Sequence, residues 1–194
     1  MSAPDHTCAV RNVTPRYVID LAFPVDYPDE RALADYLIAV CDEFVAAAES
    51  PPEHDWPYSL GATSTSHHSG DQTKGTTSVV LTFSQDANPH PVTWFKAFNY
   101  DNGGQVPIAL DSLLAPGTRP LDVIYPAVRQ ELEKRWAPEV LTSMLGEVDD
   151  ATFGNFAITD AAVIFYFGQG QVLGHAEGPL EVSVPRSELE AASH

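Results

Sequence analysis

The sequence predicts a single α+β domain over residues 15–192, in which an antiparallel sheet is packed by two main helices and a β-hairpin closes the chain. Strand-like runs are broken by only two long helical segments, so the elements do not alternate as βαβ units. A chain of 194 residues with 44% apolar residues is also long enough to bury one core. We expect two sequence modules, 15–104 and 105–192, behind a flexible polar arm over 1–14.

The first module opens with a strand and a helix. Residues 16–24 are rich in β-forming side chains and end at Pro24. Asp29 is a suitable N-cap for a helix over 30–49, and three prolines in 50–57 end that helix. The helix is predicted because apolar residues recur on one face at three- and four-residue spacing: Leu33, Leu37, Val40, Cys41, Phe44 and Ala48.

Three strands follow the helix, over residues 58–68, 75–86 and 90–101. The first is rich in Thr and Ser. In the other two, consecutive side chains face opposite sides of the sheet, and apolar residues recur at every second position. The links between them are turn-like, so the sequence predicts an antiparallel meander. Asn-Gly-Gly at 102–104 marks the next turn.

The second module has shorter elements, with one longer helix over 120–137. Pro126 lies inside this helix, so we expect a kink there or a helix that starts near Tyr125. The other expected elements are a short strand and a helical turn over 107–117, a loop with one helical turn over 138–154, two strands joined by a tight turn at Asp160 over 155–167, a strand over 178–185 and a terminal helical turn over 186–192.

The run Val163–Phe167 is apolar at five consecutive positions. A strand with apolar side chains on both faces is buried on both faces, so this strand is expected at the centre of a sheet, covered by a helix. A Gly-Gln-Gly turn at 168–170 and the strand over 178–185 then complete the closing hairpin.

The formal charge of −17 limits the classes of partner. Nucleic acids and anionic membranes both attract Lys and Arg, so neither is expected to bind this chain. An acidic surface instead favours encounter with a basic protein. No run approaches the roughly 20 apolar residues of a membrane span. No basic and apolar leader opens the chain either. We therefore expect a cytosolic protein, or an exported one whose signal peptide is absent from this sequence.

One catalytic arrangement can be drawn in the closing segment. The chain has no G-x-S-x-G elbow, but Ser187, His175 and Asp160 could serve as nucleophile, base and orienting acid of a serine esterase. The simpler interpretation is that Ser187 caps the terminal helical turn and that His175 is a surface side chain. His175 and Glu177 could also be a ligand pair, but a metal needs three or four ligands and no third is indicated.

A second polar cluster lies at the end of the strand over 58–68. His67, His68 and Asp71 offer two imidazoles and a carboxylate, and Ser66 and Ser69 are adjacent to this pair. Consecutive strand residues point to opposite faces, so the two histidines are not expected to hold one metal. We predict no metal and no cofactor for the protein.

The two cysteines allow two states. If the protein is exported, a Cys8–Cys41 disulfide would fix the N-terminal arm and close a loop of about 33 residues, worth about 3 kcal/mol in the chain-entropy model. Alternatively, Cys41 is an ordinary buried thiol on the apolar face of its helix.

Three ordered segments resemble one known family. "LAFPVDYPDERALADYL" at 21–37, "TWFKAFNYDNGGQVPIALDSLLAPG" at 93–117 and "NFAITDAAVIFYFGQGQVLGHAEGPLEVSVPRSEL" at 155–189 are similar to motifs of the mycobacterial secreted immunogenic protein family, the major secreted antigens with MPT and MPB prefixes. The last segment also resembles the extracellular domain of RsiV-type anti-sigma factors. The resemblance extends over nearly the whole chain.

The resemblance implies a β-grasp-like sheet and a secreted or cell-wall-associated antigen of a mycobacterium-like cell. Members of the family have been assigned a weak carboxylesterase activity, and RsiV-type domains bind lysozyme. Three hypotheses follow: a secreted, non-catalytic interaction module with a protein partner; a weak secreted carboxylesterase acting on short acyl esters; or a protein that captures a basic ligand such as lysozyme. We expect a monomer in each case.

Overall fold

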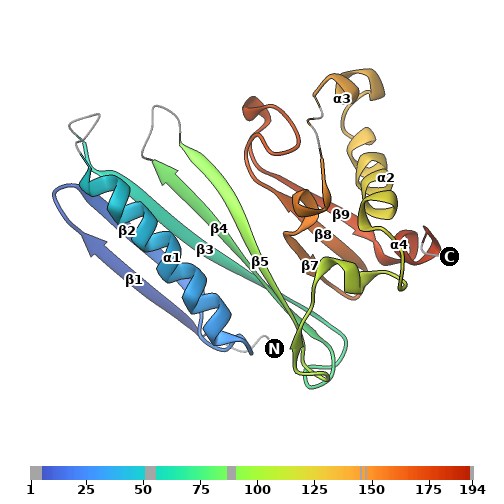
Figure 1. The fold of residues 1–194 in the computed structure, drawn as a ribbon, viewed down its shortest axis with the longest axis horizontal. Helices are drawn as coiled ribbons and strands as arrows, with labels where there is room; N and C mark the ends of the chain where they lie inside the picture. Colours follow the sequence, from blue (N-terminus) through green and yellow to red (C-terminus); the bar gives the residue numbers. More distant parts are fainter. Residues whose placement is uncertain (1–5, 51–55, 87–90, 145, 147, 193–194) are drawn as a thin grey trace.

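The computed structural model describes residues 6–50, 56–86, 91–144, 146 and 148–192. Within them the chain forms two β-sheets and several helices, which confirms the α+β class (Figure 1). The first sheet has the order β1 (Thr7–Val13), β2 (Tyr17–Pro24), β3 (Tyr58–Ser69), β4 (Thr76–Asp86), β5 (Val92–Asp101) and β6 (Val106–Pro107). The second sheet has the order β7 (Phe156–Ile158), β8 (Ala162–Phe167) and β9 (Leu180–Pro185). The helices are α1 (Glu30–Glu49), α2 (Pro120–Glu133), α3 (Pro138–Met144) and α4 (Arg186–Ala192), with 3-10 turns η1 (Leu110–Leu113), η2 (Asp150–Phe153) and η3 (His175–Glu177).

Helix α1 covers one face of the first sheet. It starts where predicted, because the Asp29 side chain accepts a hydrogen bond from the Ala32 amide at 3.1 Å. Near its other end, Phe44 packs edge-on against Tyr17 of β2, with 5.9 Å between ring centroids. The helix joins β2 to β3, and these two strands pair in parallel. The first sheet is therefore not wholly antiparallel, because α1 returns the chain in the direction in which β2 ran.

Part of the N-terminal arm, expected to be flexible over 1–14, forms a strand at Thr7–Val13. Thr7–Val13 pairs antiparallel with β2 along its whole length, while residues 1–5 lie outside the described part. Most side chains of this edge strand are exposed, so it carries no apolar pattern that would predict it. It is held mainly by backbone hydrogen bonds to β2.

The second sheet has β8 at its centre, as the apolar run predicted. Val163, Phe165 and Phe167 face a core that α2 covers, whereas Ile164 and Tyr166 face the first sheet. Helix α2 begins at Pro120 and contains Pro126, so the alternative start near Tyr125 is wrong. The stretch over 138–154 is more helical than expected, with α3 followed by η2.

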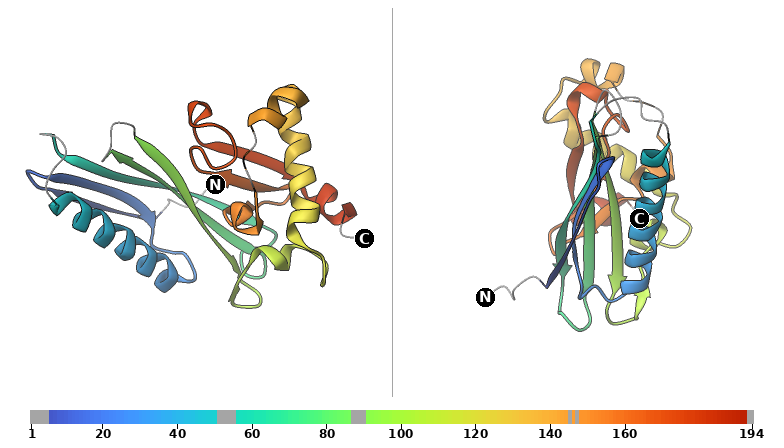
Figure 2. Two further views of the ribbon diagram at one scale, coloured as in Figure 1. Left: turned by 45° about the horizontal axis from the view of Figure 1, so that its top comes forward. Right: turned by 90° about the vertical axis from the view of Figure 1, so that its left-hand side faces the viewer.

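The two sheets pack face to face, and we call the interface between β3–β5 and the second sheet the seam. Helix α1 and the second sheet lie on opposite faces of the first sheet (Figure 2). The middle of the seam is apolar and contains Val80, Phe95, Ala97, Ala157 and Tyr166. The first sheet is thus covered on both faces along β4, which explains why Val79, Val80 and Leu81 are all buried.

Next to this apolar patch, a row of polar side chains connects the two sheets by hydrogen bonds. His67, Ser78 and Asn99 are neighbours across β3, β4 and β5, and each forms a hydrogen bond to the second sheet. The bonds join His67 Nε2 and the Tyr166 hydroxyl (3.0 Å), the Ile158 amide and Ser78 Oγ (3.0 Å), and Asn99 Nδ2 and the Phe156 carbonyl (2.9 Å).

Candidate functional site

The structure does not bring the three residues of the proposed triad together. Ser187 and Asp160 lie near one end of β8, where Ala162 pairs with Pro185. His175 lies beyond the other end, past Phe167. A strand of six residues separates the two ends by about 17 Å, too far for a hydrogen bond from His175 to Ser187.

Each of the three side chains has another role or environment. Asp160 Oδ1 accepts a hydrogen bond from the Gly70 amide at 2.7 Å, which links the β7–β8 turn to the end of β3. Ser187 is exposed in the first turn of α4, whose first residue is Arg186, so it is not the N-cap. His175 is exposed in η3 and its ring lies against Gly170, where an added Cβ would meet Nε2 at 2.6 Å.

The two adjacent histidines point to opposite faces of β3. His67 faces the seam, and burial lowers its pKa, an effect that the neighbouring His68 increases and Glu181 opposes. His68 faces the other side, with Nδ1 at 3.4 Å from Thr77 Oγ1. They therefore cannot share a metal. Across the described residues, no three His, Cys, Asp or Glu side chains are grouped as a metal site.

A first cavity, of about 290 Å³, lies on the α1 side of the first sheet. Ser66 and His68 line it together because residues two apart in β3 share a face. Asp26 and the buried Tyr27 also line it, and burial together with the nearby Asp29 raises the pKa of Tyr27. We call this the α1-end cavity. It holds the serine and histidine pair that the sequence placed in one cluster.

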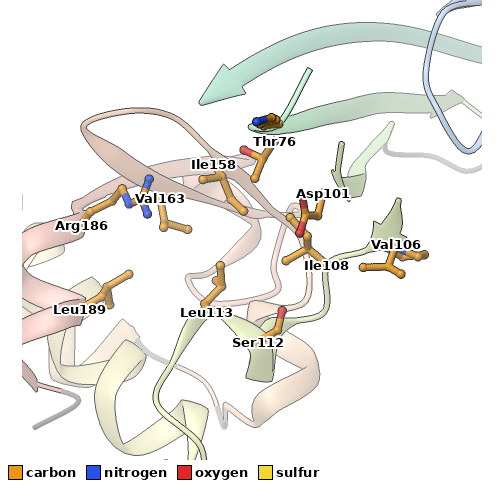
Figure 3. A pocket seen from close by; sticks show the side chains of 12 residues that line it. Thr76, Asp101, Val106, Ile108, Ser112, Leu113, Ile158, Val163, Arg186 and Leu189 are labelled. Atoms are coloured by element: carbon orange, nitrogen blue, oxygen red, sulfur yellow. The ribbon is translucent and has the colours of Figure 1, made fainter. Parts of the chain in front are cut away.

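A second cavity, of about 450 Å³, lies at the margin of the seam, between the first sheet and the α2-side core of the second module (Figure 3). Beside the polar row, the next row across the first sheet is Ser69, Thr76 and Asp101. Arg186 Nη1 of α4 reaches Ser69 Oγ at 3.2 Å, but no backbone of the second sheet covers Thr76 as it covers Ser78. We call this cavity the seam pocket. Its volume is in the range of small-molecule sites.

The seam pocket has aliphatic walls and a polar rim. Val106, Ile108 and Leu113 line it from the β6–η1 segment, and Ile158, Val163 and Leu189 from the second module's sheet and α4 (Figure 3). Its polar groups come from Lys74, Thr76, Asp101, Ser112 and Arg186. No local sequence motif marks this site, because its lining comes from segments more than 100 residues apart.

The structure leaves both cysteines as free thiols. Cys8 pairs with Phe23 near the start of α1, whereas Cys41 lies near the level of Phe44 in the third turn from the helix end. About ten helical residues lie between the start of α1, near Cys8, and Cys41, which corresponds to roughly 15 Å along the helix. A disulfide needs Cα atoms within about 7 Å. The structure therefore does not join them. Cys41 is half-buried, and burial and the nearby Asp42 raise its pKa.

Part of the sequence matches a known protein family, and solved structures of that family share the fold. Residues 111–187, which include α2 and the whole of the second sheet, match the family described as a protein of unknown function (DUF3298). Two solved DUF3298 structures share the fold over both modules. One, from Pseudomonas aeruginosa, has a TM-score of 0.67 at 14% identity, with 96% of this chain and 93% of that chain covered. The other, from Bacteroides fragilis, has a TM-score of 0.63 at 13% identity, with 93% and 89% covered.

Closer relatives define the family. The chain is 46% identical over 185 residues to the esterase Rv3036c of Mycobacterium tuberculosis, covering 94% of this chain and 81% of that protein. It is 37% identical over 185 residues to the immunogenic proteins MPT64 of Mycobacterium tuberculosis and MPB64 of Mycobacterium bovis, covering 95% of this chain and 81% of each. The chain belongs to this family of mycobacterial immunogenic proteins, as its motifs indicated. Within the described residues, no helix is both long enough and apolar enough to cross a membrane.

Proposed function

We propose that this protein is a secreted binding protein of the immunogenic type, which holds a ligand in the seam pocket and does not hydrolyse it. The seam pocket carries the proposal. It combines a volume of about 450 Å³, aliphatic walls and a few convergent polar groups, which together are typical of ligand sites. Secretion is supported by the relationship to the immunogenic proteins of the two mycobacteria.

The chemistry of the pocket favours binding over catalysis. Its lining contains neither histidine nor cysteine. Its serine, Ser112, donates its hydroxyl to the Ala109 carbonyl at 2.6 Å, so no base activates it as a nucleophile. The pocket thus offers surfaces that hold a ligand without a residue pair that would attack it.

Ester hydrolysis in the α1-end cavity is the second candidate. It is favoured by the relative named an esterase and by the shared cavity wall of Ser66 and His68. In this alternative Ser66 would attack a short acyl ester and His68 would accept its proton, with Thr77 orienting the ring through Nδ1. Both side chains are exposed, so water would compete with the ester at this site.

A nitrophenyl butyrate assay separates the two functions. The tested variants are Ser66→Ala and His68→Ala, and the matched controls are Ser187→Ala and His175→Ala, which the fold keeps about 17 Å apart. Binding without catalysis predicts only a trace rate that none of the four changes alters. Nucleophilic and general-base roles are each worth at least about a hundredfold. A hundredfold loss in either tested variant, with an unchanged circular dichroism spectrum, would establish the esterase and refute our proposal.

A further inference from the structure

We infer that the ligand of the seam pocket is an aliphatic carboxylate, such as a short or medium-chain fatty acid. This inference rests on the proposed function, because it assumes that the seam pocket is the ligand site. Three independent features of the pocket lead to it: the chemistry of its walls, a buried hydroxyl group that lacks a partner, and a local positive charge in an acidic protein.

The walls select for a hydrocarbon chain. Six lining residues are branched aliphatics, and no aromatic side chain lines the pocket. Sugars and flat heterocycles are commonly held by stacking on aromatic rings, which these walls do not offer. A flexible chain of methylene groups gains from contact with aliphatic surfaces alone, because its burial removes apolar area from water.

The Thr76 hydroxyl provides a hydrogen bond for a polar head group. Thr76 Oγ1 is buried and has no hydrogen-bond partner among the residues that the structure describes. The two residues paired with it in the sheet have partners: Ser69 Oγ is bonded to Arg186, and Asp101 Oδ1 accepts from the Gly103 and Gly104 amides at 2.9 and 3.0 Å. A buried polar group without a partner is costly. Because Thr76 lines the pocket, rotation about its Cα–Cβ bond would turn this hydroxyl toward a ligand oxygen, which would satisfy it.

The charge around this hydroxyl favours an anion. Lys74 lines the pocket, and the structure gives its ammonium group no ion pair within the described residues. Arg186 adds a second positive charge to the lining (Figure 3). Asp101 is the acidic residue of the lining, and its carboxylate is engaged by the two glycine amides. In a protein of net charge −17, a site that pairs two cations with one engaged carboxylate is suited to a carboxylate ligand.

The test is calorimetric titration of the whole protein with three probes of equal chain length: octanoate, octan-1-ol and octylammonium. Octanoate should bind most tightly, octan-1-ol more weakly and octylammonium least. Amide chemical shifts recorded with octanoate should change at Thr76 and Val163, which locates the ligand in the seam pocket.

Three variants and a control test the individual contributions. Lys74→Gln should weaken octanoate about tenfold and leave octan-1-ol unchanged, because a charge-assisted contact is lost. Thr76→Val keeps the side-chain shape and should weaken both octanoate and octan-1-ol, because each offers an oxygen to the lost hydroxyl. Val106→Trp fills the pocket from an exposed rim position and should abolish both. Lys134→Gln, an exposed change at the end of α2, should alter neither.

The outcomes separate this inference from the proposed function. If octan-1-ol or octylammonium binds as tightly as octanoate and Val106→Trp blocks the binding, the pocket is a ligand site but our assignment of a carboxylate is wrong. If none of the three probes binds at millimolar concentration, or if Val106→Trp leaves octanoate binding intact, both the inference and the seam pocket as the ligand site are refuted.

Discussion

At the scale of single residues, the seam depends on a row of paired polar groups. His67, Ser78 and Asn99 each give or take one hydrogen bond across the interface, at 2.9 to 3.0 Å. Buried polar groups that are paired fix one arrangement of the two sheets, whereas an unpaired group is costly. Within this row Asn99 Oδ1 has no partner. Thr76 lies in the next row, with Ser69 and Asp101; its hydroxyl has no partner either, and it lines the seam pocket.

The pairing of His67 with Tyr166 predicts a pH dependence of stability. Burial lowers the pKa of His67 below its ordinary value, so between the folded-state pKa and about 6.5 the unfolded chain binds more protons than the folded one. The contribution of His67 is therefore complete above pH 6.5 and is lost as the pH falls through the folded-state pKa. Urea unfolding at pH 7.5 and pH 5 should show a smaller difference in unfolding free energy for His67→Gln than for the wild type.

The control for this experiment is His175→Gln, which removes an exposed imidazole outside the seam. It should leave the wild-type difference between the two pH values unchanged. An equal pH difference in wild type and His67→Gln would show that the half-buried imidazole does not contribute to the loss of stability in acid.

At the scale of elements, amphipathic patterns could be predicted and backbone pairing could not. The helix over 30–49 was confirmed to the residue, because its apolar stripe, its Asp29 cap and the prolines that follow all agree. The central position of β8 followed from its continuous apolar run. Strand β1 and the parallel pairing of β2 with β3 were missed, since both depend on hydrogen bonds between backbones and leave no side-chain pattern.

Docking of α1 gives a prediction for stability. Leu37 lies in the apolar stripe and is 6% exposed, so Leu37→Ala should lower the unfolding free energy by about 2–5 kcal/mol. Ile38 is the matched control, since it is 58% exposed on the same helix and Ile38→Ala should change it by less than about 0.5 kcal/mol. Urea denaturation of both variants measures the difference. A similar small effect for both would mean that α1 does not dock through Leu37.

At the scale of the whole molecule, the candidate sites depend on how the two modules meet. The seam pocket takes its lining from residues 74 to 189, and its formation requires the second sheet to lie on β3–β5. No local motif contains this information, which is why the sequence indicated a triad in the closing segment and missed the pocket. The proximity of Ser187 and His175 in the sequence was misleading, because the extended strands β8 and β9 carry them to opposite ends of the sheet.

The net charge of the whole molecule gives the last prediction. With 27 acidic and 10 basic residues, the protein should attract a basic protein such as lysozyme at low ionic strength, by long-range attraction. Calorimetric titration with lysozyme at 10 mM salt should show binding that weakens steeply by 150 mM, where the Debye length is about 8 Å. Succinylated lysozyme, which has the same fold with its lysines made acidic, should not bind at either salt concentration. Absence of lysozyme binding at 10 mM would exclude charge-driven capture, whereas binding that salt does not weaken would show that a specific surface, and not the net charge, recognises the partner.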